Sequence, residues 1–147
     1  MRRKVIITGL TTLTMLLLSG CGASGPKFEG FKKPSKGKAN VYIYRTSYAG
    51  AAVVPDIHKT NLSTNKDEVI GSVEPNGYIM TTVKPDKYKF WAKTEVENEV
   101  QLKANPDEIY CIEHYISIGF LIGHPQFKLV DMEKCKKEIE HTNLSSK

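Results

Sequence analysis

The sequence predicts an all-β protein: a single β-sandwich, immunoglobulin-like or transthyretin-like, with a short C-terminal helix. From residue 39 onward, short runs rich in β-branched and aromatic residues alternate apolar and polar side chains, which is the period of a strand. Turn residues separate these runs at short intervals. The 109 residues from 39 to 147 suffice for one hydrophobic core, and no internal repeat indicates a second domain.

The first 20 residues have the composition of an export signal. A positive cluster of Arg2, Arg3 and Lys4 precedes an uncharged, mostly apolar run from Val5 to Leu18. This run has about 14 residues, fewer than the roughly 20 that a helix needs to cross a bilayer. A signal peptide is therefore favoured over a membrane span.

The four residues 18–21, Leu-Ser-Gly-Cys, resemble the lipobox of bacterial lipoproteins. In that family a diacylglyceryl group is transferred to the cysteine sulfur, and the signal peptidase then cuts before the lipidated residue. We therefore expect a lipid anchor on Cys21 and a membrane partner, the alternative being an ordinary secretory signal with a chance cysteine. Gly22 is not the Asp that retains Gram-negative lipoproteins in the inner membrane. In a Gram-negative envelope this implies the outer membrane, facing the periplasm.

Residues 22–38 are rich in Gly, Pro, Ser and Lys, and Phe28 and Phe31 are their only large apolar side chains. This composition predicts a flexible tether, so we expect a signal peptide at 1–20, the lipidated cysteine and tether at 21–38, and the sandwich at 39–147. The tether lysines either approach anionic headgroups or merely keep the linker solvated.

The basic character of the chain belongs mostly to its N-terminal part. Removing residues 1–20 lowers the formal net charge from +5 to +2, and the tether contributes +4 of what remains. The domain from residue 39 onward is therefore slightly acidic, at −2. It offers no basic surface for nucleic acid, and we expect no nucleic-acid partner.

Eight strands and a helix are expected in the domain. The strands are expected at 40–45, 51–57, 68–73, 78–83, 88–93, 96–103, 109–118 and 127–130. Pro55 places the second at a sheet edge, because proline cannot donate to a ladder. Pro75 and Asn76-Gly77 predict a hairpin between the third and fourth. In the fifth, Tyr88, Phe90 and Ala92 alternate with Lys89, Trp91 and Lys93.

After residue 130 the hydrophobic period changes from that of a strand to that of a helix. Met132, Cys135 and Ile139 fall at i, i+3 and i+7, which places them on one narrow stripe. Asp131 is a suitable N-cap. We expect a short C-terminal helix that buries this stripe.

Several blocks of the domain resemble domain-of-unknown-function family 2846. In chain order they are Val41-Tyr42-Ile43-Tyr44-Arg45, Ile70-Gly71-Ser72-Val73, Asn76-Gly77-Tyr78, Val83-Lys84-Pro85-Asp86-Lys87-Tyr88 and Ile109-Tyr110-Cys111-Ile112. Members of that family are commonly bacterial lipoproteins or exported proteins. The resemblance therefore implies an exported β-sandwich, and it supplies no activity.

Cys111 and Cys135 are the two thiols of the domain. In the strand 109–118 the even-numbered residues form the more apolar face, so Cys111 points to the other side. A helix laid over that outer side would bring Cys135 to it. We expect a disulfide, worth about 3 to 4 kcal/mol for a loop of roughly 25 residues, the alternative being two unpaired cysteines.

No catalytic, metal or cofactor site is expected from the sequence. Cys111 and His114 stand three apart on a strand and so face opposite sides, which excludes a thiol–imidazole pair unless the backbone bends. His114 is expected to be a hydrogen-bonded core residue. The other three histidines are scattered without the ligand spacing of a zinc site.

Two places are candidates for a binding face. The segment 116–123 is the most apolar of the domain, and it is either a buried strand with a bend or a protruding contact for a partner or membrane. Lys89, Trp91 and Lys93 share one strand face, where Trp91 either binds a ligand or is covered by lysine stems or the helix. Phe120 lies in the segment 116–123.

The favoured function is that of a non-enzymatic envelope lipoprotein that binds another envelope component. A second hypothesis is a module for glycan or peptidoglycan fragments that uses Trp91, Tyr42 and Tyr44. A third is an enzyme whose active residues form no recognised motif. No cofactor is expected under the first two.

Overall fold

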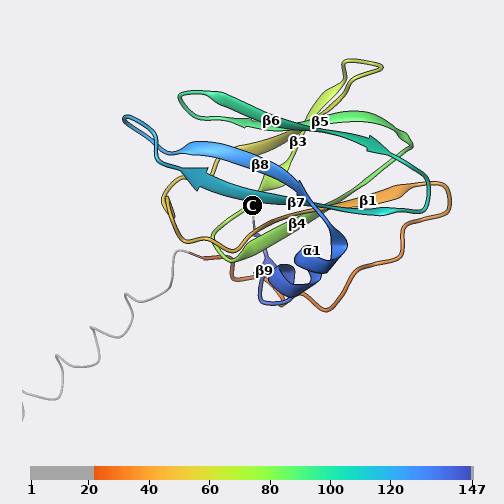
Figure 1. Ribbon diagram of the computed structural model, residues 1–147, viewed down its shortest axis with the longest axis horizontal. Helices are drawn as coiled ribbons and strands as arrows, with labels where there is room; N and C mark the ends of the chain where they lie inside the picture. Colours follow the sequence, from red (N-terminus) through yellow and green to blue (C-terminus); the bar gives the residue numbers. More distant parts are fainter. Residues whose placement is uncertain (1–21, 147) are drawn as a thin grey trace, which may run out of the picture.

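Two β-sheets packed face to face form the body of the protein, which confirms the predicted β-sandwich (Figure 1). The computed structural model describes residues 22–146. The elements are β1 Ala39–Arg45, β2 Asp56–Asn61, β3 Asp67–Ser72, β4 Gly77–Val83, β5 Asp86–Lys93, β6 Glu97–Ala104, β7 Ile109–Ser117, β8 His124–Val130, α1 Met132–Ile139 and β9 Asn143–Leu144.

The five-stranded sheet has the order β8-β7-β1-β4-β9 and the four-stranded sheet the order β3-β2-β5-β6. β1 pairs in parallel with β7, β4 pairs in parallel with β9, and the other neighbours are antiparallel. The inward faces form one core. Val41, Ile43 and Ile112 from the first sheet meet Phe90 and Leu102 from the second.

The expected hairpin between β3 and β4 is wrong. β3 pairs with β2 in the four-stranded sheet, whereas β4 pairs with β1 in the five-stranded sheet. The turn itself is present, and Asn76 takes the positive φ of 54° that such turns require. Turn residues mark where the chain reverses, but they do not determine which strands pair. Here β3 and β4 join different sheets, and Val73 and Ile79 are both buried in the core between the two sheets.

The second strand was also misplaced, because residues 51–55 form a loop and β2 runs from 56 to 61. Arg45 explains the loop. Its guanidinium is fully buried at the end of β1 and donates hydrogen bonds to the carbonyl oxygens of Ala49, Gly50 and Val53 at 2.9 to 3.0 Å. Carbonyls that satisfy a buried cation are not available to a sheet ladder, so this apolar segment curls around Arg45.

Residues 23–38 do not form a flexible tether, contrary to the expectation. The N–H of Ala23 donates to the carbonyl of Pro75 at 2.9 Å, and that of Phe28 donates to the carbonyl of Thr142 at 2.9 Å. The rings of Phe28 and Phe31 lie 5.1 Å apart and pack edge-on against Tyr42. Phe28 and Phe31, the two large apolar side chains of this segment, are the residues that pack it against the five-stranded sheet.

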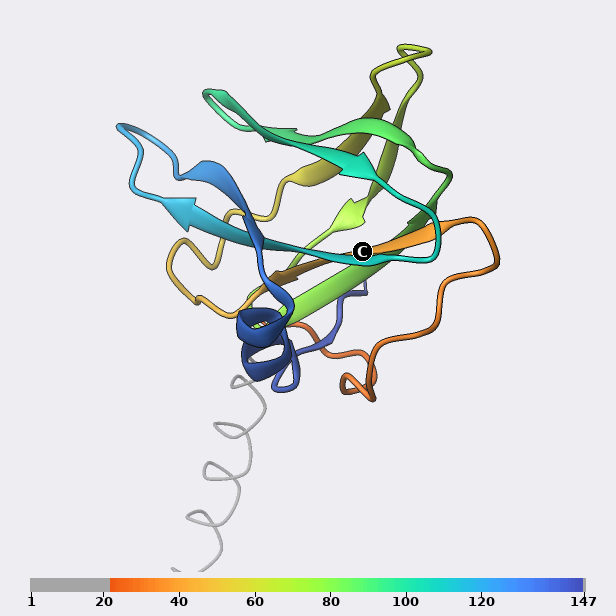
Figure 2. The ribbon, with the colours of Figure 1, turned by 45° about the vertical axis from the view of Figure 1, so that its right-hand side comes forward.

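A third layer therefore covers the outer face of the five-stranded sheet. Figure 2 shows α1 and the N-terminal segment side by side on the face of β1 and β4 that points away from β5 and β6. Tyr42, Tyr44 and Cys111 from the sheet, together with Cys135 and Ile139 from α1, form a second buried cluster there. Residues 23–38 thus belong to the folded unit together with residues 39–146.

We predict that Phe28→Ala lowers the free energy of unfolding by about 2 to 3 kcal/mol. This is less than for a fully buried ring, because Phe28 is only partly buried. Urea denaturation measures the change, and the exposed Lys33→Ala in the same segment is the control, expected within about 0.5 kcal/mol of the parent. Equal stability of both variants would show that the segment does not contribute to the fold.

Candidate binding surfaces

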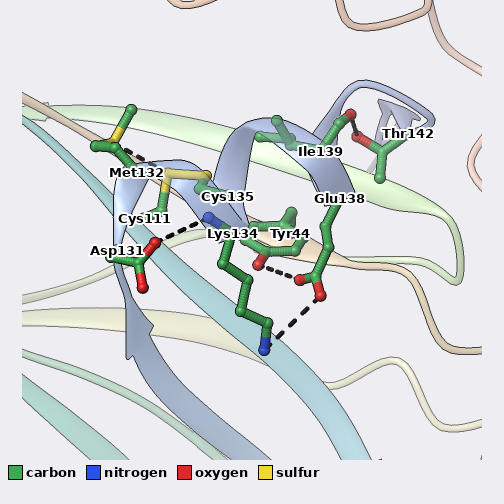
Figure 3. The surroundings of a disulfide bond; sticks show 9 residues. All are labelled: Tyr44, Cys111, Asp131, Met132, Lys134, Cys135, Glu138, Ile139 and Thr142. Carbon is green, nitrogen blue, oxygen red and sulfur yellow. Dashed lines mark hydrogen bonds and ion pairs between the residues drawn. A yellow bond between two sulfur atoms is a disulfide. The ribbon is translucent and has the colours of Figure 1, made fainter.

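The disulfide between Cys111 and Cys135 is formed, as the sequence predicted, and it holds α1 against β7 (Figure 3). Cys111 points outward from the sheet and Cys135 lies on the buried stripe of the helix. Asp131 caps the helix, accepting a hydrogen bond from the N–H of Lys134 at 2.8 Å. These thiols serve as a staple for the outer layer, and neither is free to act as a nucleophile.

Tyr44 links β1 to the same helix. Its hydroxyl donates to the Glu138 carboxylate at 2.5 Å (Figure 3). Burial, and then the hydrogen bond to Glu138, raise the pKa of Tyr44 well above its usual value, so the phenol remains a donor. Lys134 contacts the Glu113 carboxylate at 2.6 Å and thereby ties the exposed side of the helix to β7.

His114 lies on the opposite face of β7 from Cys111, within the sandwich, as predicted. Its side chain is 1% exposed, stacks on Phe127 with 4.8 Å between ring centres, and donates from Nδ1 to the carbonyl of Gln126 at 3.0 Å. Burial lowers the pKa of His114 to about 4. It is a neutral core residue that cannot meet the thiol of Cys111.

Trp91 lies on the outer face of the four-stranded sheet and is half-buried. The ring of His58, directly across from it on β2, stacks on the indole with 4.1 Å between centres. Lys89 Nζ lies 5.1 Å from the ring centre. The indole N–H donates to Thr60 Oγ1 at 2.9 Å and to Asp67 Oδ1 at 3.1 Å. The indole is therefore held in one orientation by its neighbours.

Asp67 is the acceptor that organises this cluster. Its carboxylate receives hydrogen bonds from Thr60 at 2.6 Å, His58 at 2.8 Å and Trp91. Burial by itself would raise the pKa of Asp67, but these three hydrogen bonds outweigh it and hold the pKa below its usual range. We call these residues, with Lys89, the Trp91 cluster.

Tyr42 and Tyr44 cannot share a ligand surface with Trp91, which corrects the aromatic set of the glycan hypothesis. Both tyrosines are buried beneath the N-terminal segment and α1, with 2% and 0% exposure. They belong to the five-stranded sheet, whereas Trp91 faces solvent from the other sheet. The strand alternates Val-Tyr-Ile-Tyr, and both of its faces are buried.

The apolar segment 116–123 divides into a buried end and a protruding loop. Ile116 is packed inside at 5% exposure, whereas Ile118, Phe120 and Leu121 are 99%, 94% and 84% exposed. Gly119 allows the tight turn, since a Cβ there would lie 1.7 Å from the carbonyl oxygen of Ile122. The structure thus favours the protruding alternative for residues 118–122, which we call the apolar loop.

Beside the apolar loop lies an open groove. It is lined by Ala52, Val53, Val54, Pro55, Lys93, Thr94, Glu95 and Ile122. Two contacts hold its walls together: Thr94 Oγ1 donates to the carbonyl of Gly123 at 2.9 Å, and His124 Nε2 lies 2.9 Å from Glu95.

The predicted binding residues therefore separate into two places. Lys89 and Trp91 lie together in the Trp91 cluster, whereas Lys93 lines the groove beside the loop that carries Phe120. Sequence reasoning missed Arg45, and it missed His58, Thr60 and Asp67 as partners of Trp91. A correct placement of β2 would have revealed His58 and Thr60 as alternate residues facing the tryptophan.

The predicted lipidation site, Cys21, lies outside the described residues. Within residues 22–146, no three His, Cys, Asp or Glu side chains gather closely enough to hold a metal ion. No helix in that same range has the length and apolar character needed to span a bilayer.

Comparison with known proteins adds one relative. An uncharacterized protein of Haemophilus influenzae is 28% identical over 138 residues, which cover 88% of this chain and 79% of the relative. No family model matches the chain, and no solved structure matches it.

We predict that stability falls between pH 6.5 and about 4 because of His114. The native ring stays neutral down to about pH 4, whereas the unfolded ring takes up a proton near its ordinary pKa of 6.5. The unfolded state therefore binds more protons in this window, and acidification costs up to about 3 kcal/mol. Urea denaturation across the window measures the slope.

His114→Gln should flatten that slope, whatever its effect at neutral pH. His141→Gln, at an exposed position, is the control and should retain the slope of the parent. An unchanged slope in His114→Gln would show that another group causes the acid sensitivity.

Proposed function

We propose that the protein is a non-enzymatic lipoprotein of the cell envelope that binds another envelope component through the Trp91 face of its four-stranded sheet. A lipid on Cys21 is its anchor. In a Gram-negative envelope, Gly22 at the following position favours the outer membrane, with the domain in the periplasm. The resemblance to domain-of-unknown-function family 2846, with its exported lipoproteins, agrees with this assignment.

The observation that carries the choice of face is the unequal covering of the two sheets. α1 and residues 23–38 occupy the outer side of the five-stranded sheet, so its aromatics are used in packing. In the described part of the chain, no third layer covers β2, β5 and β6 (Figure 2). Their outer side presents the indole of Trp91 and the charged side chains of β6.

The Trp91 cluster has the properties of an anchoring point for a protein partner. Contact surfaces draw most of their binding energy from a few large side chains, and tryptophan is enriched among them. His58 and the hydrogen bonds to Thr60 and Asp67 already fix the indole, so little side-chain entropy is lost on binding. Because His58 stacks on the ring, less of the indole surface is available to a sugar, which favours a protein over a glycan.

The lipid assignment is tested by Cys21→Ser. Without the thiol no diacylglyceryl group can be attached, so we expect the variant to lose incorporation of radiolabelled palmitate and to accumulate as the uncleaved precursor. Labelling is followed in the cells that make the parent, and Cys111→Ser is the control that should keep its palmitate. Palmitate retained by Cys21→Ser would end the lipoprotein proposal.

The binding face is tested by photo-cross-linking in vivo. The exposed residue Gln101 lies on β6 opposite Lys89 of the Trp91 cluster, diagonal to Trp91, whose own cross-strand partner is Glu99. We expect p-benzoylphenylalanine at position 101 to capture a discrete partner. The same group at the exposed Lys136, on α1, is the control and should not capture it. Trp91→Ala should then weaken partner binding by about 2 kcal/mol, on the order of 30-fold.

Melting of Trp91→Ala is measured in parallel, since the variant also loses the hydrogen bonds to Thr60 and Asp67. A reduced cross-link in a protein that is still folded at the growth temperature supports the face. An unchanged cross-link yield from Gln101 would show that Trp91 makes no contact with the partner.

A further inference from the structure

We infer that the apolar loop, residues 118–122, inserts into the surface of the lipid bilayer that holds the anchor. This inference rests on the proposed lipid at Cys21. It gives the domain a second attachment and a fixed orientation, with the loop toward the lipid and the Trp91 face lateral to it.

The first argument is the position of residue 22. A Cβ placed on Gly22 would lie 3.0 Å from the carbonyl oxygen of Pro75 and 3.2 Å from the hydroxyl of Tyr48. Pro75 is in the β3–β4 turn and Tyr48 in the β1–β2 loop, so both belong to the end of the sandwich where β1 finishes and β4 begins. We call this the anchor end.

The apolar loop lies at the same end. β7 is parallel to β1, so Ser117 and Arg45 finish their strands in the same direction, and the loop follows Ser117 directly. Figure 1 shows the loop between β7 and β8, the β1–β2 loop and the start of the described chain on one side of the molecule. Only β1 stands between β4 and β7, which places those two strands about 10 Å apart.

The second argument is the short reach of the chain between anchor and body. The N–H of Ala23 donates to the carbonyl of Pro75, so only Gly22 separates a lipid on Cys21 from the folded domain. The two extended steps from residue 21 to residue 23 span roughly 7 Å. A lipid held in the membrane by so short a link keeps the anchor end at the headgroups, and the loop beside it is brought to the same level.

The third argument is the chemistry of the two ends. The β1–β2 loop, residues 46–55, and the apolar loop contain no charged residue. At the same end, Glu74 in the β3–β4 turn and Glu95 in the β5–β6 turn are charged, and Glu95 is paired with His124. The loops at the opposite end carry Lys36, Lys38, Lys66, Lys84, Asp107 and Glu108. Ile118, Phe120 and Leu121 are almost fully exposed, and entry into the headgroup and acyl boundary removes their apolar surface from water. Charge is absent from the two loops that would meet the lipid.

A single added cysteine tests the inference in the full lipidated protein. Cys21 carries the lipid and Cys111 is bonded to Cys135, so Leu121→Cys supplies the one free thiol of the mature chain for an environment-sensitive NBD fluorophore. Thr64→Cys, in the exposed β2–β3 turn at the opposite end, is the matched control. Both are reconstituted in vesicles of phosphatidylethanolamine and phosphatidylglycerol.

At position 121 we expect a blue-shifted emission that loses about half its intensity to a shallow nitroxide lipid, because interfacial insertion reaches ~5–10 Å below the surface. The label at position 64 should emit as in water and resist the quencher. Adding Phe120→Asp to the Leu121→Cys variant should abolish the shift without changing the melting temperature, since Phe120 is 94% exposed.

Water-like emission from position 121 in protein whose Cys21 lipid is verified by mass spectrometry would overturn the inference and leave the lipoprotein proposal intact. Failure of the proposal itself has a different signature, because an unlipidated Cys21 would be detected by mass as a second labelled thiol. A blue shift that the nitroxide lipid does not quench would assign the loop to a protein contact, such as a second copy of the chain, and would also overturn it.

Discussion

The whole structure depends on β1 being buried on both of its faces along its full length. Val41 and Ile43 point into the space between the sheets, and Tyr42 and Tyr44 point the other way, yet all four are almost inaccessible. A strand of this kind is stable only if a second hydrophobic layer covers the outer side. The N-terminal segment and α1 provide that layer, and the disulfide prevents the helix from leaving it.

Local sequence patterns predicted most strands and the helix, but they did not predict the N-terminal segment that covers β1. Period and turn chemistry located β1 and β4 to β7 to within a residue or two, and the helical stripe located α1 with its cap. The docking of Phe28 and Phe31 was missed because only two large apolar side chains lie in a stretch of Gly, Pro and Lys. Composition over such a stretch cannot reveal that a neighbouring sheet offers an aromatic face to receive them.

The candidate sites could also be predicted from the sequence only in part. Face alternation in β5 and β7 correctly separated Trp91 from the core and Cys111 from His114, because a strand fixes side-chain direction locally. The environment of Trp91 could not be derived, since His58 reaches it from a strand that the sequence placed several residues too early. Arg45 had no signal at all: its partners are backbone carbonyls, which every sequence possesses.

Residues 25–27, near the start of the described chain, are interlocked with residues 143–144, near its end. The N–H of Gly25 donates to the carbonyl of Leu144, the N–H of Leu144 donates to the carbonyl of Pro26, and β9 fills the position between β4 and the N-terminal segment. The stretch beside residue 22 therefore cannot settle until residues 143–145 have arrived. On our proposal that Cys21 is processed during export, the enzymes would meet residues 22–27 as an extended peptide while the C-terminal residues are still in transit.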